Sequence, residues 1–253
     1  MNGRLRGKRA LITGASAGIG RAIAETYIAQ GADVFITART DEAGARAVIA
    51  LAEQVGQRAG FTLMDAASTS IDALFEEAQA AVGPLDILVN NPAFITRTPF
   101  LELSEDEYER TLAVNLRFPF FMAQRFAKDC IARKQGGSII NISSVSAFKA
   151  VSRMSAYQAS KAALSMLTRS CAVELAPYGI RVNTISPGLT ATSGNANQWR
   201  DSPEIWQNRK KEIPMQRAGM PADMAGAAIL LASDESSWMT GADLVIDGGH
   251  SCT

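Results

Sequence analysis

Seven short apolar runs alternate with longer alanine-rich stretches along the 253-residue chain, and this alternation limits the possible folds more than any other feature. Each run is almost continuously apolar, as expected of a parallel strand whose two faces are both covered. The pattern predicts an α/β protein with a doubly wound, seven-stranded parallel sheet and helices on both faces. The predicted strands are Arg9–Thr13, Asp33–Thr37, Gly60–Leu63, Leu85–Val89, Ser138–Ile142, Arg181–Ile185 and Asp243–Ile246.

Helices are expected near residues 18–30, 41–55, 68–82, 104–134, 155–177 and 221–232. Ser104 precedes Glu107 by three residues, which is the spacing of a capping box. Ser155 and Gln158 repeat that spacing, and Pro221 stands where a first helical turn would begin. No linker or charge block interrupts the alternation. We therefore expect residues 1–253 to form a single domain.

The charged side chains balance, with 25 Lys and Arg against 25 Asp and Glu. A general nucleic-acid binder needs a basic field, so this balance argues against nucleic acid and anionic membrane surfaces as partners. The one histidine, His250, lies near the C-terminus. A metal site with several histidines is therefore excluded, and a Ser-His-Asp mechanism would depend on that residue. Any proton transfer is expected to use another group.

Three cysteines, Cys130, Cys171 and Cys252, lie far apart and form no CxxC pair. They predict neither a zinc site nor a disulfide framework, and they fit buried or incidental thiols in a reducing compartment. The first residues lack the apolar core of a signal peptide, and no apolar stretch approaches the ~20 residues of a membrane span. We expect a cytoplasmic protein with no metal and no membrane partner.

A glycine-rich loop, Gly14-Ala-Ser-Ala-Gly18-Ile-Gly20, directly follows the first predicted strand and opens the first predicted helix. Glycines serve where the chain turns tightly and where backbone approaches a phosphate. The helix N-terminus then offers N–H groups and partial positive charge to a pyrophosphate. A plain glycine-rich turn is the alternative, but the strand before and the helix after favour a dinucleotide site.

The end of the second predicted strand bears on which dinucleotide binds. An NAD site places an acid here for the ribose 2′-hydroxyl, ~20 residues after the loop, whereas this chain has Ala38 followed by Arg39. A guanidinium suits a 2′-phosphate through forked, charge-assisted hydrogen bonds. Asp41 and Glu42 would weaken its field, and a solvent-facing arginine is the alternative. We expect NADP(H) to be favoured, with NAD(H) possible.

Tyr157 and Lys161 are four residues apart and share one face of a predicted helix. An ammonium near a phenol favours the phenolate, so the pKa of the tyrosine is expected to fall from ~10 toward neutrality. The pair would then supply an acid–base group without histidine. An isolated pair of this kind is more often a surface feature. Here Ser143 and Ser144 end the fifth predicted strand, where a hydroxyl suits a substrate carbonyl or alkoxide.

With these residues in view, the sequence resembles the short-chain dehydrogenase/reductase family, in its compact single-domain branch with a Rossmann-type fold. The resemblance runs from about Lys8 to Gly249. Each motif is modest alone, but their joint order and spacing are specific. The matching residues are Thr13-Gly-Ala-Ser-Ala-Gly18-Ile-Gly20, Asp65, Asn90-Asn91, Asn115, Ser144, Tyr157-x-x-x-Lys161 and Pro187-Gly188-x-x-x-Thr192.

The resemblance implies the chemistry of the central residues. Tyr157 would be the catalytic acid in ketone reduction and the base in alcohol oxidation. Lys161 would hold the nicotinamide ribose hydroxyls and lower the pKa of the tyrosine. Ser144 would polarise the substrate carbonyl.

The resemblance also implies how the cofactor is held. Asp65 and the backbone of Ala66 would face the adenine, and Thr192 would face the nicotinamide carboxamide. The other cofactor-binding positions carried over from the matched motifs are Gly14, Ser16, Gly18, Ile19, Gly20, Asn91, Tyr157, Lys161, Pro187 and Gly188.

Asn115 lies four residues before Pro119 in the long helix predicted over 104–134. Proline has no N–H, so the Asn115 carbonyl loses its intrahelical donor and the helix is expected to kink. The resemblance implies that this carbonyl binds a water of a proton relay to the lysine, which makes Asn115 a fourth catalytic position. A kinked helix with no catalytic role is the alternative.

One loop departs from the family pattern. After the fourth predicted strand the chain reads Asn90-Asn91-Pro92-Ala93, where the family usually has Asn-Asn-Ala-Gly. Pro92 removes a backbone donor, and Ala93 adds a Cβ where chain and cofactor approach closely. A tolerated variation is the favoured interpretation, and weakened or reshaped cofactor binding is the other.

The segment near 189–215 is the least regular of the chain and is predicted to close over the site as a lid. Arg97 and Arg153 are candidates for binding an anionic substrate, although a solvated surface role is favoured. Mostly apolar side chains are expected to line the pocket, which suggests a hydrophobic ketone or alcohol. These are Phe94, Ile95, Ser146, Phe148, Met154, Leu189, Trp199 and Trp206.

The stretch Leu112–Ile131 is apolar on more than one face. A helix that contacts only its own sheet needs one apolar stripe. The excess predicts a subunit interface, and the family resemblance implies a homotetramer.

The sequence therefore predicts an NADP(H)-dependent carbonyl reductase or alcohol dehydrogenase that acts on a small-molecule ketone or secondary alcohol. A catalytically silent nucleotide-binding regulator on the same fold is the alternative. The complete set of Ser144, Tyr157 and Lys161 argues against it, whereas Pro92 and Ala93 keep it open. Non-redox chemistry such as dehalogenation is less favoured, because such relatives lose the dinucleotide loop.

Overall fold

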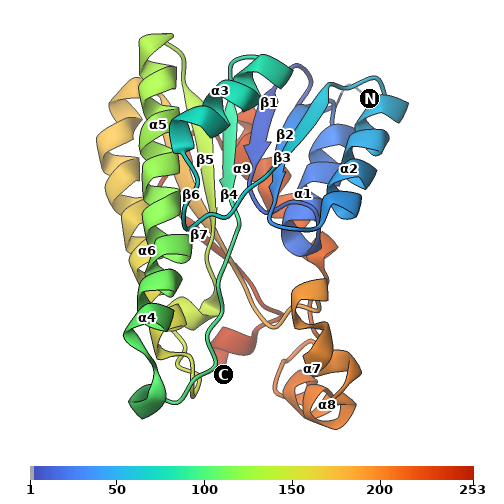
Figure 1. Cartoon of the computed structure of the whole chain (residues 1–253), viewed down its shortest axis with the longest axis vertical. Coiled ribbons are helices and arrows are strands. Elements are labelled where there is room, and N and C mark those ends of the chain that lie inside the picture. Colours follow the sequence, from blue (N-terminus) through green and yellow to red (C-terminus); the bar gives the residue numbers. More distant parts are fainter. Residues whose placement is uncertain (1–2) are drawn as a thin grey trace.

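The computed structural model describes residues 3–253 and has a seven-stranded, all-parallel sheet between two layers of helices (Figure 1). The strands are β1 (Arg9–Ile12), β2 (Asp33–Ala38), β3 (Ala59–Leu63), β4 (Ile87–Asn90), β5 (Gly137–Ile142), β6 (Ile180–Pro187) and β7 (Asp243–Ile246). The helices are α1 (Gly18–Ala29), α2 (Glu42–Gln54), α3 (Ile71–Val82), α4 (Glu105–Leu112), α5 (Phe118–Ala132), α6 (Ser155–Leu175), α7 (Ala196–Arg200), α8 (Pro203–Lys211) and α9 (Ala225–Ala232). All seven predicted strands are confirmed, with ends within two residues of the predicted ones.

The strand order is β3-β2-β1-β4-β5-β6-β7, so the winding of the chain reverses between β1 and β4. Ile12 of β1 lies opposite Ile36 of β2 on one side and opposite Val89 of β4 on the other. In a doubly wound sheet, ligands bind at this reversal, outside the carboxyl ends of the strands. The predicted site residues that follow β1, β2 and β4 therefore come to one edge.

Two cores cover the two faces of the sheet. Ala10 and Ile12 of β1 pack with α1, α2 and α9, whereas Leu11 between them packs with α3, α5 and α6. In Figure 1, α1 and α2 lie to the right of the sheet, and α5 and α6 lie to the left. Because both faces are covered, the strands need apolar residues on both sides, which accounts for the continuous apolar runs in the sequence.

The single helix predicted over 104–134 is wrong. A π-helical turn, Ala113–Arg117, separates α4 from α5. Pro119 cannot donate to Asn115, and the N–H of Phe118 donates instead to the carbonyl of Ala113, five residues earlier. The missing proline donor thus produces a widened turn at the predicted position.

The two predicted capping boxes differ in outcome. The hydroxyl of Ser104 accepts from the N–H of Glu107 at 3.2 Å, but the Glu107 carboxylate accepts from the hydroxyl of Thr98. The prediction for Ser155 is wrong, because α6 begins at this residue and Met154 is its N-cap. The Ser155 hydroxyl is buried and has no hydrogen-bond partner within residues 3–253.

Helix α5 is apolar on two faces, as predicted. Phe118, Met122 and Phe126 are buried against the sheet. Phe120 and Phe121 point the other way, with 43% and 39% of their surface exposed, and their rings pack edge to face. The helix therefore presents aromatic surface to solvent in the single chain.

Helices α7 and α8 lie apart from the two layers, beyond the carboxyl edge of the sheet (Figure 1). A bridge between Thr190 and Gly219 joins the two ends of this segment. Nowhere in residues 3–253 does a helix combine the length and the apolar character needed to cross a membrane.

Candidate active site

The loop between β1 and α1 has a conformation that requires its glycines. Gly14 and Gly18 have φ angles of 65° and 59°, in the left-handed region that favours glycine. A Cβ on Gly20 would lie 2.4 Å from the carbonyl oxygen of Gly14, so this glycine lets α1 begin against the loop. The N-terminus of α1 has no side-chain cap and no acidic residue in its first turn. It therefore presents N–H groups to an anion.

Two other loop residues have fixed positions. Ser16 is buried within the loop, and Ile19 packs against the core formed with α1, α2 and α9. The carbonyl of Ser16 lies close to the start of α2, since a Cβ on Gly44 would approach it to 2.5 Å. The glycine loop is therefore packed against the segment that follows β2.

Asn91 binds the glycine loop to the other half of the sheet. Its side-chain amide donates to the carbonyls of Thr13 at 3.1 Å and Gly14 at 2.8 Å. From the opposite side, the hydroxyl of Thr37 accepts from the N–H of Gly14 at 3.0 Å. Pro92 packs on the same glycine, so the departure from the family pattern lies directly against the loop.

Arg39 follows β2 at the surface and lies near Asp65. The Asp65 carboxylate accepts from the N–H of Ala67 at 2.9 Å and from Arg110 at 2.8 Å. The pKa of Asp65 is lowered chiefly by the bond from Ala67, then by that from Arg110, with a smaller contribution from the charge of Arg39. Ala66 is partly buried against the core of α3, α5 and α6.

The two acids beside Arg39 have partners of their own. Asp41 accepts from the N–H of Gly44 at 2.9 Å and caps α2. Glu42 pairs with Arg46 one helical turn later. Neither carboxylate forms an ion pair with Arg39.

The residues predicted after β6 also come to the glycine loop. A Cβ on Gly188 would lie 2.6 Å from the Cβ of Asp247, so glycine is required where β6 ends beside β7. A Cβ on Gly18 would lie 3.6 Å from Thr192. The segment that starts at Pro187 therefore carries Thr192 to the start of α1.

The side chain of Asn115 connects three parts of the site. It is fully buried, accepts from the N–H of Phe94 at 2.7 Å and donates to the carbonyl of Phe94 at 2.9 Å. Its amide also donates to the hydroxyl of Ser160 at 3.0 Å, which in turn donates to the carbonyl of Tyr157 at 2.7 Å. The π-helical turn thus holds the loop after β4 against α6.

Ser144, Tyr157 and Lys161 meet at the carboxyl end of β5. The Ser144 side chain lies near the Tyr157 phenol and contributes to its pKa. The ammonium of Lys161 lies 5.8 Å from the centre of the Tyr157 ring and donates to the carbonyl of Ile142 at 2.8 Å. Lys161 is 1% exposed and has no carboxylate partner among residues 3–253. A buried lysine is thereby held beside a buried phenol.

The predicted lowering of the Tyr157 pKa is wrong for this arrangement. Burial raises the pKa of the phenol, and the hydroxyl of Ser144 and the charge of Arg97 oppose that rise. Burial likewise lowers the pKa of Lys161 to about 7. The sequence argument counted the attraction between ammonium and phenolate but not the desolvation of both groups, which disfavours each charged form.

Comparison with known proteins helps to interpret the arrangement of Ser144, Tyr157 and Lys161. Residues 14–251 match the family model described as enoyl-(acyl carrier protein) reductase. The chain is 39% identical over 246 residues to 3beta-hydroxysteroid dehydrogenase 1 of Eggerthella lenta, covering 97% of this chain and 94% of that one. The chain belongs to the short-chain dehydrogenase/reductase family.

Two further members of the short-chain dehydrogenase/reductase family illustrate the likeness. D-threitol dehydrogenase of Mycolicibacterium smegmatis is 40% identical over 248 residues, covering 98% of this chain and 94% of that one. The crystal structure of 3-oxoacyl (acyl-carrier-protein) reductase from Agrobacterium tumefaciens C58, with NADP bound, superimposes with a TM-score of 0.88. It is 35% identical, and the match covers 96% of this chain and 94% of that one.

Sequence reasoning missed three residues that support the site in this short-chain dehydrogenase/reductase. Thr37 holds Gly14, Ser160 connects Asn115 to Tyr157, and Arg110 binds Asp65. Thr37 lies on a predicted strand beside the glycine loop, and Ser160 directly precedes Lys161. Their nearness to predicted site residues could have identified both. Arg110 lies 45 positions from its partner and had no local signal.

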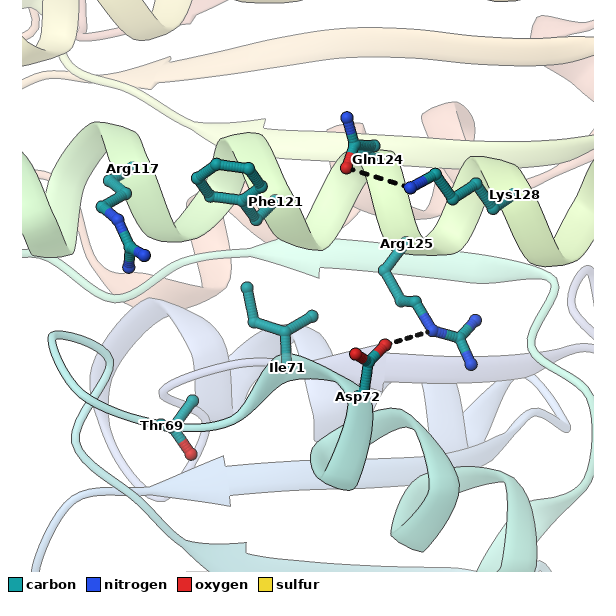
Figure 2. A pocket seen from close by; sticks show the side chains of 8 residues that line it. All are labelled: Thr69, Ile71, Asp72, Arg117, Phe121, Gln124, Arg125 and Lys128. Atoms are coloured by element: carbon teal, nitrogen blue, oxygen red, sulfur yellow. Dashed lines mark hydrogen bonds and ion pairs between the residues drawn. The ribbon is translucent and has the colours of Figure 1, made fainter.

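A separate groove of about 260 Å³ lies between α5 and the segment that leads into α3 (Figure 2). It contains none of the predicted site residues. Its cations have partners: Arg125 pairs with Asp72 and Lys128 donates to Gln124, while Arg117 lies over the ring of Phe121. Within residues 3–253, no three His, Cys, Asp or Glu side chains are grouped as metal ligands.

Lys161→Met should remove a pH-dependent loss of stability. The pKa of Lys161 is 10.5 when unburied and about 7 in the fold, so between these pH values the unfolded chain binds a proton that the folded chain does not. The wild type therefore loses stability as pH falls from 10.5 to 7, by about 5 kcal/mol at most, and the loss is constant below pH 7. The methionine side chain does not titrate, so the variant lacks this pH dependence of stability.

Urea denaturation of the cofactor-free protein at pH 7, 8, 9 and 10 measures this effect. The stability of Lys161→Met minus that of the wild type should grow as pH falls from 10 to 7. Lys128→Met, at an exposed position, should show no such trend. A difference that stays constant for Lys161→Met would contradict a buried, proton-poor lysine.

Proposed function

We propose that this chain is an NADP(H)-dependent carbonyl reductase or alcohol dehydrogenase acting on a small ketone or secondary alcohol. The observation that carries the proposal is the meeting of Ser144, Tyr157 and Lys161 at the end of β5. They lie at the same sheet edge as the glycine loop. The named dehydrogenase and reductase relatives support the reaction class.

The residues present fit a dinucleotide. The positive φ angles of Gly14 and Gly18 and the close approach at Gly20 leave backbone, rather than side chains, at the uncapped start of α1. Gly14, Ser16, Gly18, Ile19 and Gly20 would hold the pyrophosphate. Asp65, the Ala66 backbone and Asn91 would lie along the adenosine half, and Pro187, Gly188 and Thr192 would contact the nicotinamide half.

The proposed chemistry divides between a hydride and a proton. The bound nicotinamide supplies or accepts the hydride at the substrate carbon. In reduction, Tyr157 donates its phenolic proton to the carbonyl oxygen, and the hydroxyl of Ser144 donates a hydrogen bond to the same oxygen. In oxidation, the tyrosine accepts that proton. Lys161 holds the ribose hydroxyls.

In this scheme the side chain of Asn115 mainly positions other parts of the site. Its amide fixes the backbone of Phe94 and, through Ser160, the first turn of α6 that carries the tyrosine. The water relay from its carbonyl to Lys161 is part of the proposal. The position of Pro119 supports it, because proline has no N–H to donate to the Asn115 carbonyl four residues earlier.

Tyr157→Phe should lower kcat by at least a hundredfold, because the proton donor is lost while the ring is kept. The dissociation constant for NADPH, measured by fluorescence titration, should stay within about threefold. Tyr178→Phe, at an exposed tyrosine, is the matched control and should retain wild-type turnover.

The same assay separates the enzyme from the silent regulator. NADPH oxidation is followed with a broad panel of ketones and keto acids. A wild type that binds NADPH but reduces none of these substrates would favour the catalytically silent regulator. Substantial activity in Tyr157→Phe would contradict the proposed role of the tyrosine.

The preference for NADP(H) over NAD(H) rests on Arg39. It stands at the surface after β2, beside Asp65, and the neighbouring acids Asp41 and Glu42 have other partners. A 2′-phosphate beside this guanidinium would gain forked hydrogen bonds. The NADP-bound relative supports the assignment.

Arg39→Gln should lower kcat/KM for NADPH by more than tenfold and change kcat/KM for NADH less than twofold. Arg58→Gln, which removes an arginine paired with Asp33 at the other end of the sheet, should alter neither. A wild type that prefers NADH, with the same preference in Arg39→Gln, would reverse the assignment.

We also propose that the chain assembles as a homotetramer through the exposed aromatic face of α5. Phe120 and Phe121 are the residues that support it. Multi-angle light scattering should give four chain masses for the wild type and a smaller particle for Phe121→Glu, because a carboxylate would lose its hydration in an apolar contact. A monomeric wild type would contradict the interface.

The proposed setting is the cytoplasm, with residues 1–253 as one domain and residues 189–215 as a lid. All three cysteines are unpaired, which fits a reducing compartment. The lid is supported by the place of α7 and α8 beyond the carboxyl edge of the sheet (Figure 1).

A further inference from the structure

The groove beside α5 is basic and partly aromatic (Figure 2). Arg117, Arg125 and Lys128 line it together with the exposed ring of Phe121. Arg125 pairs with two carboxylates of its own chain. Lys128 contacts only the neutral amide of Gln124, at 3.3 Å, and Arg117 lies 5.2 Å from the centre of the Phe121 ring. Within residues 3–253, neither of these two cations has a carboxylate within 4.0 Å. The groove therefore carries excess positive charge beside an exposed aromatic side chain.

The segment of residues 100–109, which leads into α4 and forms its first half, has the opposite charge. It reads Phe100-Leu-Glu-Leu-Ser-Glu-Asp-Glu-Tyr-Glu109, with five acids and no cation. Its apolar side chains also stand in water, since Leu101 is 94% exposed and Phe100 is 76% exposed. Exposed apolar groups within a charged surface are typical of a protein contact. We call residues 100–109 the acidic segment.

The capping of α4 accounts for only part of this negative charge. Glu105, Asp106 and Glu107 lie in the first turn of α4, where the helix dipole favours carboxylates. Glu102 precedes the helix and Glu109 lies in its second half, beyond the reach of that effect. Within residues 3–253, none of these five carboxylates forms an ion pair with a cation. The acidic segment therefore lacks counter-charges in its own chain, as the groove does.

The two surfaces belong to consecutive helices. In Figure 1, α4 and α5 follow one another along one side of the molecule, with the π-helical turn between them, and both contact α6. Glu105 and Arg125 each lie ten residues from Asn115 in that turn, about 15 Å along the helices at 1.5 Å per residue. Glu102 and Lys128 are likewise at equal separations from Asn115. A two-fold axis across the turn would therefore bring the acidic segment of one copy beside the groove of another, and symmetry would repeat the contact.

A two-fold axis through the middle of α5 is disfavoured by charge. Arg117 and Arg125 each lie four residues from Phe121, so an axis at Phe121 would place one arginine of each copy near the other arginine of its partner. Like charges that face each other across an interface are costly, whereas opposite charges fix orientation and register. The charge pattern therefore favours an axis at the turn.

We propose that the acidic segment of one copy of this chain binds the α5 groove of a second copy, with Glu102 beside Lys128 and with its exposed apolar side chains against the outer face of α5. The contact occurs twice, once in each direction. The proposal rests on the assembly through α5 that is part of the proposed function, and it names the surface that covers α5. It does not depend on the reaction that the chain catalyses.

Charge reversal tests the pairing. Glu102→Lys and Lys128→Glu should each raise the concentration at which the assembly dissociates by about fivefold at low ionic strength, because like charges then face each other. Both changes in one chain restore opposite charges and should return that concentration to within about twofold of the wild-type value. Glu53→Lys, at an exposed position of α2 on the other face of the sheet, is the control and should change nothing. Analytical ultracentrifugation of a dilution series measures these values, and losses that do not recover in the double variant would contradict the pairing.

Carbodiimide coupling locates the contact, since it joins a carboxylate to an amine that touches it. Unlabelled and ¹⁵N-labelled chains are mixed at a dilution that dissociates the assembly, concentrated, coupled and digested. Mass spectrometry should find peptides in which Lys128 of one label is joined to residues 100–109 of the other. Lys211, exposed at the end of α8, is the control and should form no link to that segment. Links of Lys128 to its own chain alone would contradict the proposal.

The outcomes separate this inference from the assembly on which it rests. A monomeric wild type would contradict both. An assembled wild type that Phe121→Glu dissociates, but in which Lys128 still reacts with acetic anhydride and couples to no partner carboxylate, would contradict the contact alone. Protection of Lys128 without a link between chains would assign the groove to another occupant and overturn the proposal. Turnover of ketones with NADPH is measured separately, so a failure of the proposed reaction is distinguishable from either result.

Discussion

The side-chain amide of Asn91 joins the two halves of the sheet at the point where the strand order reverses. It donates to the carbonyls of Thr13 and Gly14, and the glycine loop between β1 and α1 is held there with Thr37 on its other side. A buried parallel sheet leaves functional groups only at its edges. The site depends on the fixed position of the glycine loop. The start of α1, the segment after β6 and the loop after β4 all pack against it.

Burial determines the electrostatics of the site more than individual charge pairs do. Tyr157 and Lys161 are both withdrawn from water, so each charged form is disfavoured in the chain itself. Attraction between the two groups does not overcome that cost here. The charge of Arg97 and the hydroxyl of Ser144 oppose the rise in the pKa of the phenol but do not reverse it.

Local sequence signals succeeded where one local interaction decides the structure. The apolar runs identified every strand, and Pro119 marked the irregular turn between α4 and α5, because a missing N–H has the same consequence in any fold. They failed where several interactions compete. Ser155 has the spacing of a capping residue, yet α6 begins one residue earlier than that spacing requires, and the Ser155 hydroxyl is left without a partner within residues 3–253. The helix predicted over 104–134 failed because the proline widens the turn rather than bending a continuous helix.

The sequence by itself determined the layered sheet, the glycine loop and the family, because periodicity and motif spacing are properties of the chain order. It also named Ser144, Tyr157 and Lys161. Only the tertiary structure decided how deeply these groups are buried and that the amide of Asn115 binds both Phe94 and Ser160. Desolvation and contacts between distant segments depend on how the whole chain packs, and no local pattern of residues encodes them.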